Sequence, residues 1–305
     1  MVFYALFAPI VWASETCTTP IDQHCSVSSG SHQDPHLHFA HGGSADFRGE
    51  DGKYYALLSA PGIHFAARTR ESDFVLPNGP ILVHGTFFTE VAFVMRGKSG
   101  RVYGVKSDSN AVGFEVYDLG LSKRIAPEPE LIVKKHGIWT DWNNEDVSIM
   151  YKQSTLVVRS NGWEANSTRN HIYNHISGIS RWRFDLAMRT LSGTELETKH
   201  GSTSKTCYAH GIIAQSYDGD DVAVDGKKDN YTVNSLHPVF TTSAQAEGAI
   251  EGEAKDYCTS SAFDTKFRFS RFHFNSEDVC AARDVSSLKG KKHKKDSASN
   301  VGSML

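Results

Sequence analysis

Short β-forming runs separated by turn dipeptides are the feature that most restricts what this 305-residue chain can fold into. Many of the runs alternate apolar and polar side chains, and pairs such as Asp51-Gly52 and Asn78-Gly79 break the chain between them. This spacing is typical of an antiparallel sandwich or barrel, because each strand buries one face and a tight turn reverses the chain. The segments that we expect to be strands are 54–59, 63–69, 86–95, 101–105, 113–117, 131–135, 147–151, 155–159, 181–187 and 267–274.

Helical signals are few, which favours the same fold class. Residues 244–254 are rich in helix formers, but Gly248 and Gly252 interrupt them, so we expect a loop or a short turn there. Residues 267–274 alternate aromatic with polar side chains and slip once at Ser270-Arg271, which is the pattern of a β-bulge. The sequence has no dominant repeat, which argues against a propeller. We therefore predict an all-β fold, an antiparallel sandwich of two packed sheets with few short helices.

The N-terminus has the character of a secretory signal. Residues 1–13 are mostly apolar and carry no charged side chain, and they are too few for a membrane-spanning helix, which needs about 20 apolar residues. Val11 and Ala13 supply the small or medium side chains that signal peptidase requires. Because the segment lacks lysine and arginine, a buried first strand and a truncated start are the alternatives. No other segment is long and apolar enough to cross a membrane.

Cysteines and glycosylation sequons also indicate an extracellular protein. The cysteine count is odd, so one thiol is free or pairs between chains, and no Cys-x-x-Cys pair suggests a zinc ribbon or a redox site. Asn166 and Asn230 each begin an Asn-x-Thr sequon for glycosylation. Together with the signal, these features favour secretion into an oxidising compartment. The disulfide candidates are Cys17, Cys25, Cys207, Cys258 and Cys280.

Charge is unevenly distributed along the chain. The formal net charge is −3, yet the last residues carry a block of lysines from Lys289 to Lys295, so the remaining body is mildly acidic. An acidic body argues against a nucleic-acid-binding face. The tail is expected to be a disordered, solvated terminus, with a glycan- or phosphate-binding patch as the alternative. The expected organisation is a signal at 1–13, a Cys/Ser/Thr-rich leading segment at 14–30, a single β-rich domain at 31–284 and the lysine-rich tail at 285–305.

The sharpest local motif is Asp34-Pro35-His36, which follows Gln33 and precedes a glycine-rich stretch. It resembles the Gly-Asp-Pro-His opening of von Willebrand factor type D domains, with Gln33 in place of the glycine. Later segments, at 84–94, 210–216, 251–257 and 267–272, are similar to plant root-cap proteins, a branch of the same group. The resemblance implies a β-sandwich in which the motif is structural. Proline holds the preceding aspartate extended, where its carboxylate can accept backbone N–H bonds, and the histidine can donate to a neighbouring strand.

An acidic stretch between Ser216 and Gly226 is the best candidate for a metal site. It places four carboxylates close together among glycines, and calcium prefers six to eight such oxygen ligands. The order of residues is not that of an EF-hand, but the resemblance places the calcium loop of type D domains here. In that family the loop is flanked by cysteines, whereas this chain has His210 and Ala214. An ordinary acidic surface turn is the alternative. The tentative calcium ligands are Asp218, Asp220, Asp221 and Asp225.

Other chemistry-bearing residues give weaker signals. His32, His36, His38 and His41 could suggest a metal cluster. His36 and His38 would share one face of a strand, a workable ligand spacing, but nothing nearby marks a general base for a zinc enzyme, so surface and core histidines are the better explanation. The tryptophans Trp139, Trp142, Trp163 and Trp182 are better explained by packing than by sugar stacking. The chain has no nucleophile elbow, P-loop, dinucleotide-binding glycines or His-Glu-x-x-His motif.

The sequence thus predicts a non-catalytic, secreted or cell-surface module of structural or adhesion type, with calcium as its one expected cofactor. Its partner would be a protein or glycan of an extracellular matrix or cell wall, and an intermolecular disulfide is compatible with the odd cysteine. Two alternatives remain. One is a glycan-binding protein that uses exposed tryptophans and the lysine tail. The other is a hydrolase whose acid and base lie among Asp141, Glu145 and Asp146.

Overall fold

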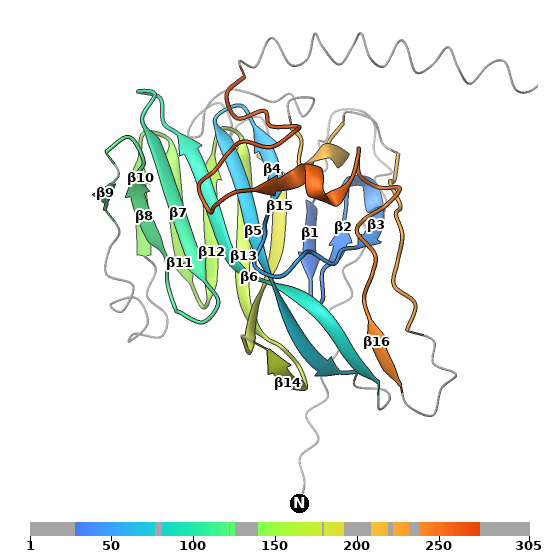
Figure 1. Cartoon of the computed structure of the whole chain (residues 1–305). Coiled ribbons are helices and arrows are strands. Elements are labelled where there is room, and N and C mark those ends of the chain that lie inside the picture. Colours follow the sequence, from blue (N-terminus) through green and yellow to red (C-terminus); the bar gives the residue numbers. More distant parts are fainter. Residues whose placement is uncertain are drawn as a thin grey trace, which may run out of the picture.

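The computed structural model describes residues 28–76, 81–121, 123–125, 140–178, 180–191, 209–218, 222–231 and 238–274. These residues form two packed, mostly antiparallel sheets, and no helix in the described part reaches seven residues (Figure 1). The predicted all-β sandwich is therefore confirmed. The expected signal at 1–13 and the lysine-rich tail at 285–305 lie outside the described residues.

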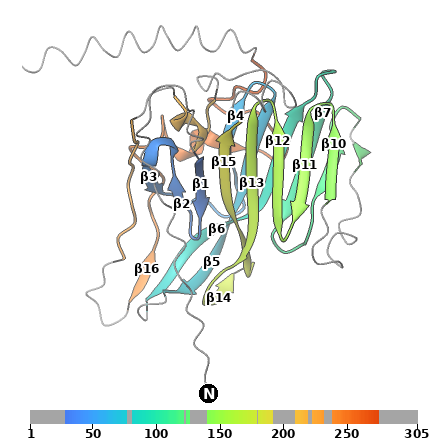
Figure 2. The same cartoon turned by 180° about the vertical axis from the view of Figure 1, so that it is seen from behind.

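The first sheet has eight strands in the order β10-β11-β12-β13-β15-β1-β2-β3, and it faces the viewer in Figure 2. Its first strand starts at Ser28, ahead of the expected domain boundary at residue 31. The strands of this sheet are β1 (Ser28–His32), β2 (His36–His38), β3 (Ser44–Asp46), β10 (Thr140–Asn144), β11 (Val147–Lys152), β12 (Thr155–Ser160), β13 (Trp163–His171) and β15 (Trp182–Thr190).

The second sheet is built around a long hairpin of β5 and β6, whose lower half extends past the first sheet (Figure 1). The order of its main path is β17-β4-β5-β6-β7-β8-β9, and two further strands flank the extended half of the hairpin, β14 beside β5 and β16 parallel to β6. Its strands are β4 (Tyr54–Ala60), β5 (Ile63–Val75), β6 (Leu82–Arg96), β7 (Val102–Asp108), β8 (Glu115–Asp118), β9 (Lys123–Arg124), β14 (His175–Gly178), β16 (Val239–Thr241) and β17 (Cys258–Thr259). Three short 3-10 turns complete the described elements, η1 (Ala40–Gly42), η3 (Ala214–Ser216) and η4 (Ala254–Tyr257).

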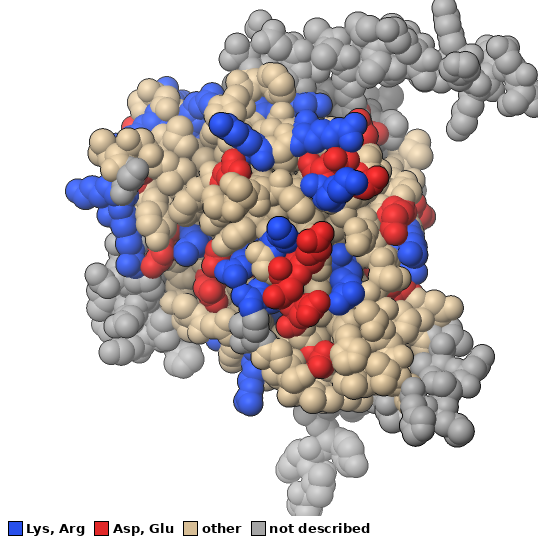
Figure 3. Space-filling view, viewed as in Figure 1, with Lys and Arg blue, Asp and Glu red and all other residues tan. Residues whose placement is uncertain are grey.

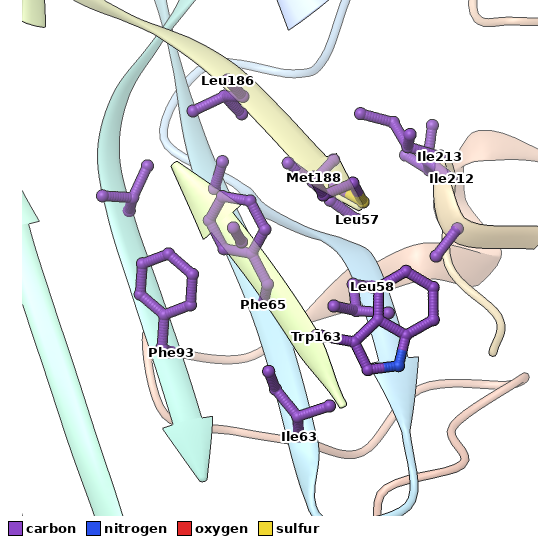
Figure 4. Close-up of a cluster of buried hydrophobic side chains, with 14 of the residues drawn as sticks. Leu57, Leu58, Ile63, Phe65, Phe93, Trp163, Leu186, Met188, Ile212 and Ile213 are labelled. Atoms are coloured by element: carbon purple, nitrogen blue, oxygen red, sulfur yellow. The ribbon is translucent and has the colours of Figure 1, made fainter. Parts of the chain in front are cut away.

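Apolar side chains from both sheets meet in one core (Figure 4). In β11 and β12 the alternation of the sequence is followed closely, because Val147, Ile149, Leu156 and Val158 are buried while their neighbours are only partly so. Figure 4 shows side chains of β4, β5 and β6 pointing toward those of β13 and β15, with the turn at 212–213 closing one end. Burial of this apolar surface is the main stabilising term of the fold.

The central strands of the second sheet are buried on both faces, because the segment 250–274 crosses their outer side (orange in Figure 1). Its backbone is bonded to the hairpin between β4 and β5, since the Gly62 amide donates to the Phe272 carbonyl and the Arg271 amide to the Ser59 hydroxyl. Phe269 and Phe272 are buried in this contact. Because both faces of these strands are covered, the sequences of β4, β5 and β6 are apolar at nearly every position of their buried parts.

The prediction of a strand at 267–274 is wrong. These residues form successive turns, in which the Ser270 amide bonds to the Phe267 carbonyl and the Phe274 amide to the Arg271 carbonyl. Their alternation of aromatic and polar side chains arises because one side packs on the sheet, and the expected bulge at Ser270-Arg271 does not exist. Residues 244–254 form turns up to η4, as expected, and the segment 131–135 lies outside the described residues.

Replacing Gln33 by glycine is expected to raise the melting temperature by about 1–3 °C. For a chain of this size, that shift corresponds to a gain of a fraction of a kcal/mol in the free energy of unfolding. Gln33 opens the turn between β1 and β2 with a φ of 56°, a left-handed conformation that costs a residue with a side chain roughly 1–2 kcal/mol. Glycine avoids that cost but adds about 0.5–1 kcal/mol of freedom to the unfolded chain. Gln33→Ala, which keeps the strain, is the matched control in thermal melts. Equal melting temperatures for Gln33→Gly and Gln33→Ala would contradict the prediction.

Candidate functional site

The side chain of Asp34 joins three separate parts of the chain. It lies in the turn between β1 and β2, is 5% exposed, and accepts hydrogen bonds from the Thr86 amide and the Tyr231 hydroxyl, both at 3.1 Å. Burial raises the pKa of Asp34 to about 7, against the opposing effect of the Thr86 hydrogen bond. A β-carbon at Gly85 would stand 2.8 Å from the carboxylate, so glycine is needed beside it. The motif therefore connects the first sheet to β6 and to the segment 222–231.

His36 continues this connection through a chain of carboxylates. Its Nδ1 lies 2.6 Å from Oδ1 of Asp46 on β3, and the other oxygen of Asp46 accepts the Asp229 amide at 2.6 Å. The Asp229 carboxylate in turn accepts the amides of Ser243 and Ala244. Burial opposes the charged imidazolium, but the hydrogen bond and charge of Asp46 outweigh it with help from other acids, so the pKa of His36 is raised.

Pro35 completes the group, because its carbonyl accepts the Phe47 amide at 2.9 Å. Asp34, Pro35 and His36, which we call the motif anchor, are thus brought together with β3, β6 and two distant loop segments. Each polar atom described above is used to hold backbone or a neighbouring side chain. The chemistry of the motif anchor is that of a buried hydrogen-bond network that fixes one arrangement of the chain.

A second cluster lies on the outward face of the β1–β2 hairpin. His32, His36 and His38, which we call the histidine row, share this face because Leu37 between them points into the core. Nδ1 of His32 lies 2.9 Å from Nε2 of His38, and the two rings stack at a centroid distance of 4.6 Å and an angle of 4°. Burial, together with the neighbouring histidines, lowers the pKa of His32 to about 4, and burial also lowers the pKa of His38.

Asp225 and Gly226, at the end of the acidic stretch, lie against the edge strand β3. The amide of Gly226 donates to the Ser44 carbonyl, and Oδ1 of Asp225 accepts the Ser44 amide at 2.9 Å. Asp218 is half-buried just beyond η3, while Asp220 and Asp221 lie outside the described residues. Within the part of the chain that the structure describes, no three His, Cys, Asp or Glu side chains gather as a metal-binding group.

The predicted cysteine and glycosylation sites are only partly described. Cys258 on β17 is half-buried, is a free thiol and pairs in register with Tyr55, whereas Cys17, Cys25, Cys207 and Cys280 fall outside the described residues. Asn166 lies within β13 and pairs in register with Val157 and Ala187 of the neighbouring strands. Asn230 is exposed in the segment 222–231.

The acids considered for a hydrolase hold two turns together. Glu145 accepts bonds from the Ser99 amide and hydroxyl and from the Tyr103 hydroxyl, and the Ser99 hydroxyl bond is foremost among the causes that lower the pKa of Glu145. Asp146 pairs with Lys98 at 2.7 Å. The side chain of Asp141 is outside the description. The carboxylates of Glu145 and Asp146 therefore dock the β10–β11 turn on the turn that precedes β7.

Of the four tryptophans considered for sugar stacking, Trp163 and Trp182 have side chains within the described residues. Trp163 is buried, in edge contact with the Tyr217 ring, and the guanidinium of Arg169 stands 3.6 Å from the centre of the Trp182 ring. Trp163 is therefore a core residue, and one face of Trp182 is covered. The side chains of Trp139 and Trp142 lie outside the described part.

Fold and motif anchor together define an antiparallel β-sandwich module whose first strands are tied to distant loops by buried polar bonds. Its helices within the described residues are all too short to pass through a lipid bilayer. The sequence matches no protein-family model and no curated protein.

Proposed function

We propose that this chain is a secreted or cell-surface β module of structural or adhesion type, related to type D domains of the root-cap branch, without catalytic activity of its own. The observation that carries the proposal is the motif anchor. A structural Asp-Pro-His motif should be bonded to other strands. Asp34 is buried and accepts the Thr86 amide of β6, and the half-buried His36 is bonded to the Asp46 carboxylate of β3. A partner in a matrix or cell wall follows from the proposed location.

The ion pairs of the sheets support a structural role. Glu164 on the first sheet is 6% exposed and lies between Arg159 and Arg189, at 2.6 and 2.9 Å. On the face shown in Figure 3, basic and acidic side chains are intermixed. Arg70 pairs with Asp51 at 3.0 Å. Charges that satisfy one another hold strands in register, whereas a general acid and base would face a common substrate.

Secretion is tested by expressing the full chain in a eukaryotic secretory cell. We expect the protein in the culture medium, with a mass that falls on enzymatic removal of N-glycans and a smaller fall for Asn230→Gln. Asn166→Gln is the companion variant. It tests whether an asparagine that lies within a strand also carries a glycan. Retention in the cytosol of an unglycosylated protein would contradict an extracellular role.

Calcium is proposed as the ion of the acidic stretch, held by Asp218, Asp220, Asp221 and Asp225. Their carboxylates are hard oxygen donors of the kind that calcium prefers, and the Ser44 amide already orients the Asp225 carboxylate. When bound, the ion would stabilise the loop against β3.

Addition of calcium is expected to raise the melting temperature of the wild-type protein by several degrees, since a ligand at 100 times its Kd adds about 2.7 kcal/mol of stability. Asp220→Ala and Asp225→Asn should remove most of that rise. Asp264→Asn is the matched control and should keep the rise in melting temperature. Asp264 lies in a different turn, whose Phe263 packs against β7 and β8. A melting temperature that calcium leaves unchanged in the wild type rules out the ion while leaving the proposed module intact.

A further inference from the structure

We propose that the outward face of the β1–β2 hairpin binds one divalent transition-metal ion through His32 and His38. The site is an open one with two protein ligands, suited to Zn²⁺, Ni²⁺ or Cu²⁺, and water completes the coordination. This proposal is independent of the calcium loop and goes beyond the structural role of the module.

The spacing of the two ring nitrogens carries the inference. At 2.9 Å, Nδ1 of His32 and Nε2 of His38 are close enough to share one proton or one ion between them. Two nitrogens bound to one metal at 2.0–2.1 Å are about 3.3 Å apart in a tetrahedral site and about 2.9 Å apart at adjacent corners of a square-planar site. Since the rings are nearly parallel, one ring must turn about its Cβ–Cγ bond for both lone pairs to reach the ion.

The hairpin holds these ligands in place before any ion arrives. His32 pairs in register with His36, and His38 lies two residues further along the same face. The turn between the strands is fixed by Asp34, so the backbone of both ligands is tied to β6 and to Tyr231. Preorganisation of this kind reduces the entropy that is lost when the ion binds.

Charges near the pair act in both directions. Asp185 lies near His32 and accepts the Gln33 amide at 3.0 Å, which places an anion beside the site. Arg183, Lys228 and His36 add positive charge, which opposes a bound cation. Imidazole nitrogen selects zinc, copper and nickel over calcium and magnesium.

A third imidazole near the pair belongs to His36, whose ring centre lies 5.6 Å from that of His32. Nδ1 of His36 is bonded to Asp46, which fixes the ring and leaves Nε2 as the nitrogen that could meet a metal. The described residues contain no ready group of three ligands, so the affinity should be that of a two-histidine site, far weaker than a closed four-ligand zinc site.

The test is titration of the purified full chain with Zn²⁺ by calorimetry in a buffer without calcium. We expect His32→Gln and His38→Gln each to weaken the affinity at least tenfold. His84→Gln, a half-exposed histidine on β6 whose Nδ1 is bonded to Asp73, is the matched control and should bind as the wild type does. Thermal melts without metal check that all three variants fold.

A second measurement reads the ligands directly. With one equivalent of Cu²⁺, electron paramagnetic resonance should show coupling to two imidazole nitrogens in the wild type and in His84→Gln, and to fewer in His32→Gln and His38→Gln. Zinc affinity and copper coupling that are the same in the wild type and in both ligand variants would overturn the proposal, as would the absence of saturable zinc binding.

Discussion

Replacing His64 by leucine is expected to stabilise the protein, and to do so more strongly at pH 4.5 than at pH 7. His64 lies on β5, is fully buried, and neither ring nitrogen has a hydrogen-bond partner. Its ring is 5.9 Å from that of Phe267, under the segment that covers the second sheet. A buried polar group without a partner costs about 1–3 kcal/mol, which leucine removes at every pH.

The pH dependence follows from the pKa of His64, which burial lowers to about 4 despite the opposing charge of Asp264. An unfolded histidine titrates near 6.5, so between these values the unfolded chain takes up a proton that the folded protein does not. His64 therefore leaves the free energy of unfolding unchanged with pH above about 6.5, and it lowers that free energy as the pH falls toward 4. The shift corresponds to a loss on the order of 3 kcal/mol.

Urea unfolding at pH 7, 6, 5 and 4.5 measures the effect. The free energy of unfolding of the wild type should fall over this range more steeply than that of His64→Leu. Phe65→Leu, at a buried position of the same strand that does not titrate, is the control and should keep the wild-type slope. If His64→Leu and the wild type lose stability in parallel, the histidine is not held neutral in the folded protein.

Strands with one buried face could be predicted, because apolar and polar side chains alternate along their sequences. Residues 147–151 and 155–159 alternate cleanly, and they form β11 and β12. β13 has few apolar residues after Ala165 and was not expected as a strand, since its pairing with β12 and β15 supplies what its sequence lacks. Residues 267–274 show the opposite error, because a segment that packs one side on a sheet can alternate without pairing with any strand.

Of the residues in the candidate sites, those that stand in a local motif could be predicted, and those that the fold brings together from distant parts of the chain could not. Asp34 and His36 stand in one local motif, and the restriction that proline imposes was enough to mark them. Their partners Thr86, Tyr231 and Asp229 are far away in the chain and carry no signal of their own. The contact of His32 with His38 depends on the register of the β1–β2 hairpin, and a slip of one residue would place one of them on the other face.

Asp34→Ala is expected to cost about 3 kcal/mol, the largest loss that we expect from a single side chain outside the core, since it removes the partner of a buried amide. The Thr86 amide and the Tyr231 hydroxyl would both lose their acceptor. Asp34→Asn is the informative companion. Its oxygen can still accept the amide and its nitrogen can donate to the hydroxyl oxygen, so it should retain most of the stability in denaturant unfolding.

The contact of Asp34 with Gly85 allows a stricter test by a double-mutant cycle. Gly85→Ala alone should destabilise the protein, because its new methyl group would meet the carboxylate at 2.8 Å. In the Asp34→Ala background that space is open, so the second substitution should cost far less, with a coupling free energy of about 1–3 kcal/mol. Strict additivity would mean that the carboxylate does not lie against β6, and the structural role given to the motif would fall with it. Coupling of the expected sign would show that one glycine on β6 is needed because an aspartate from another sheet approaches it.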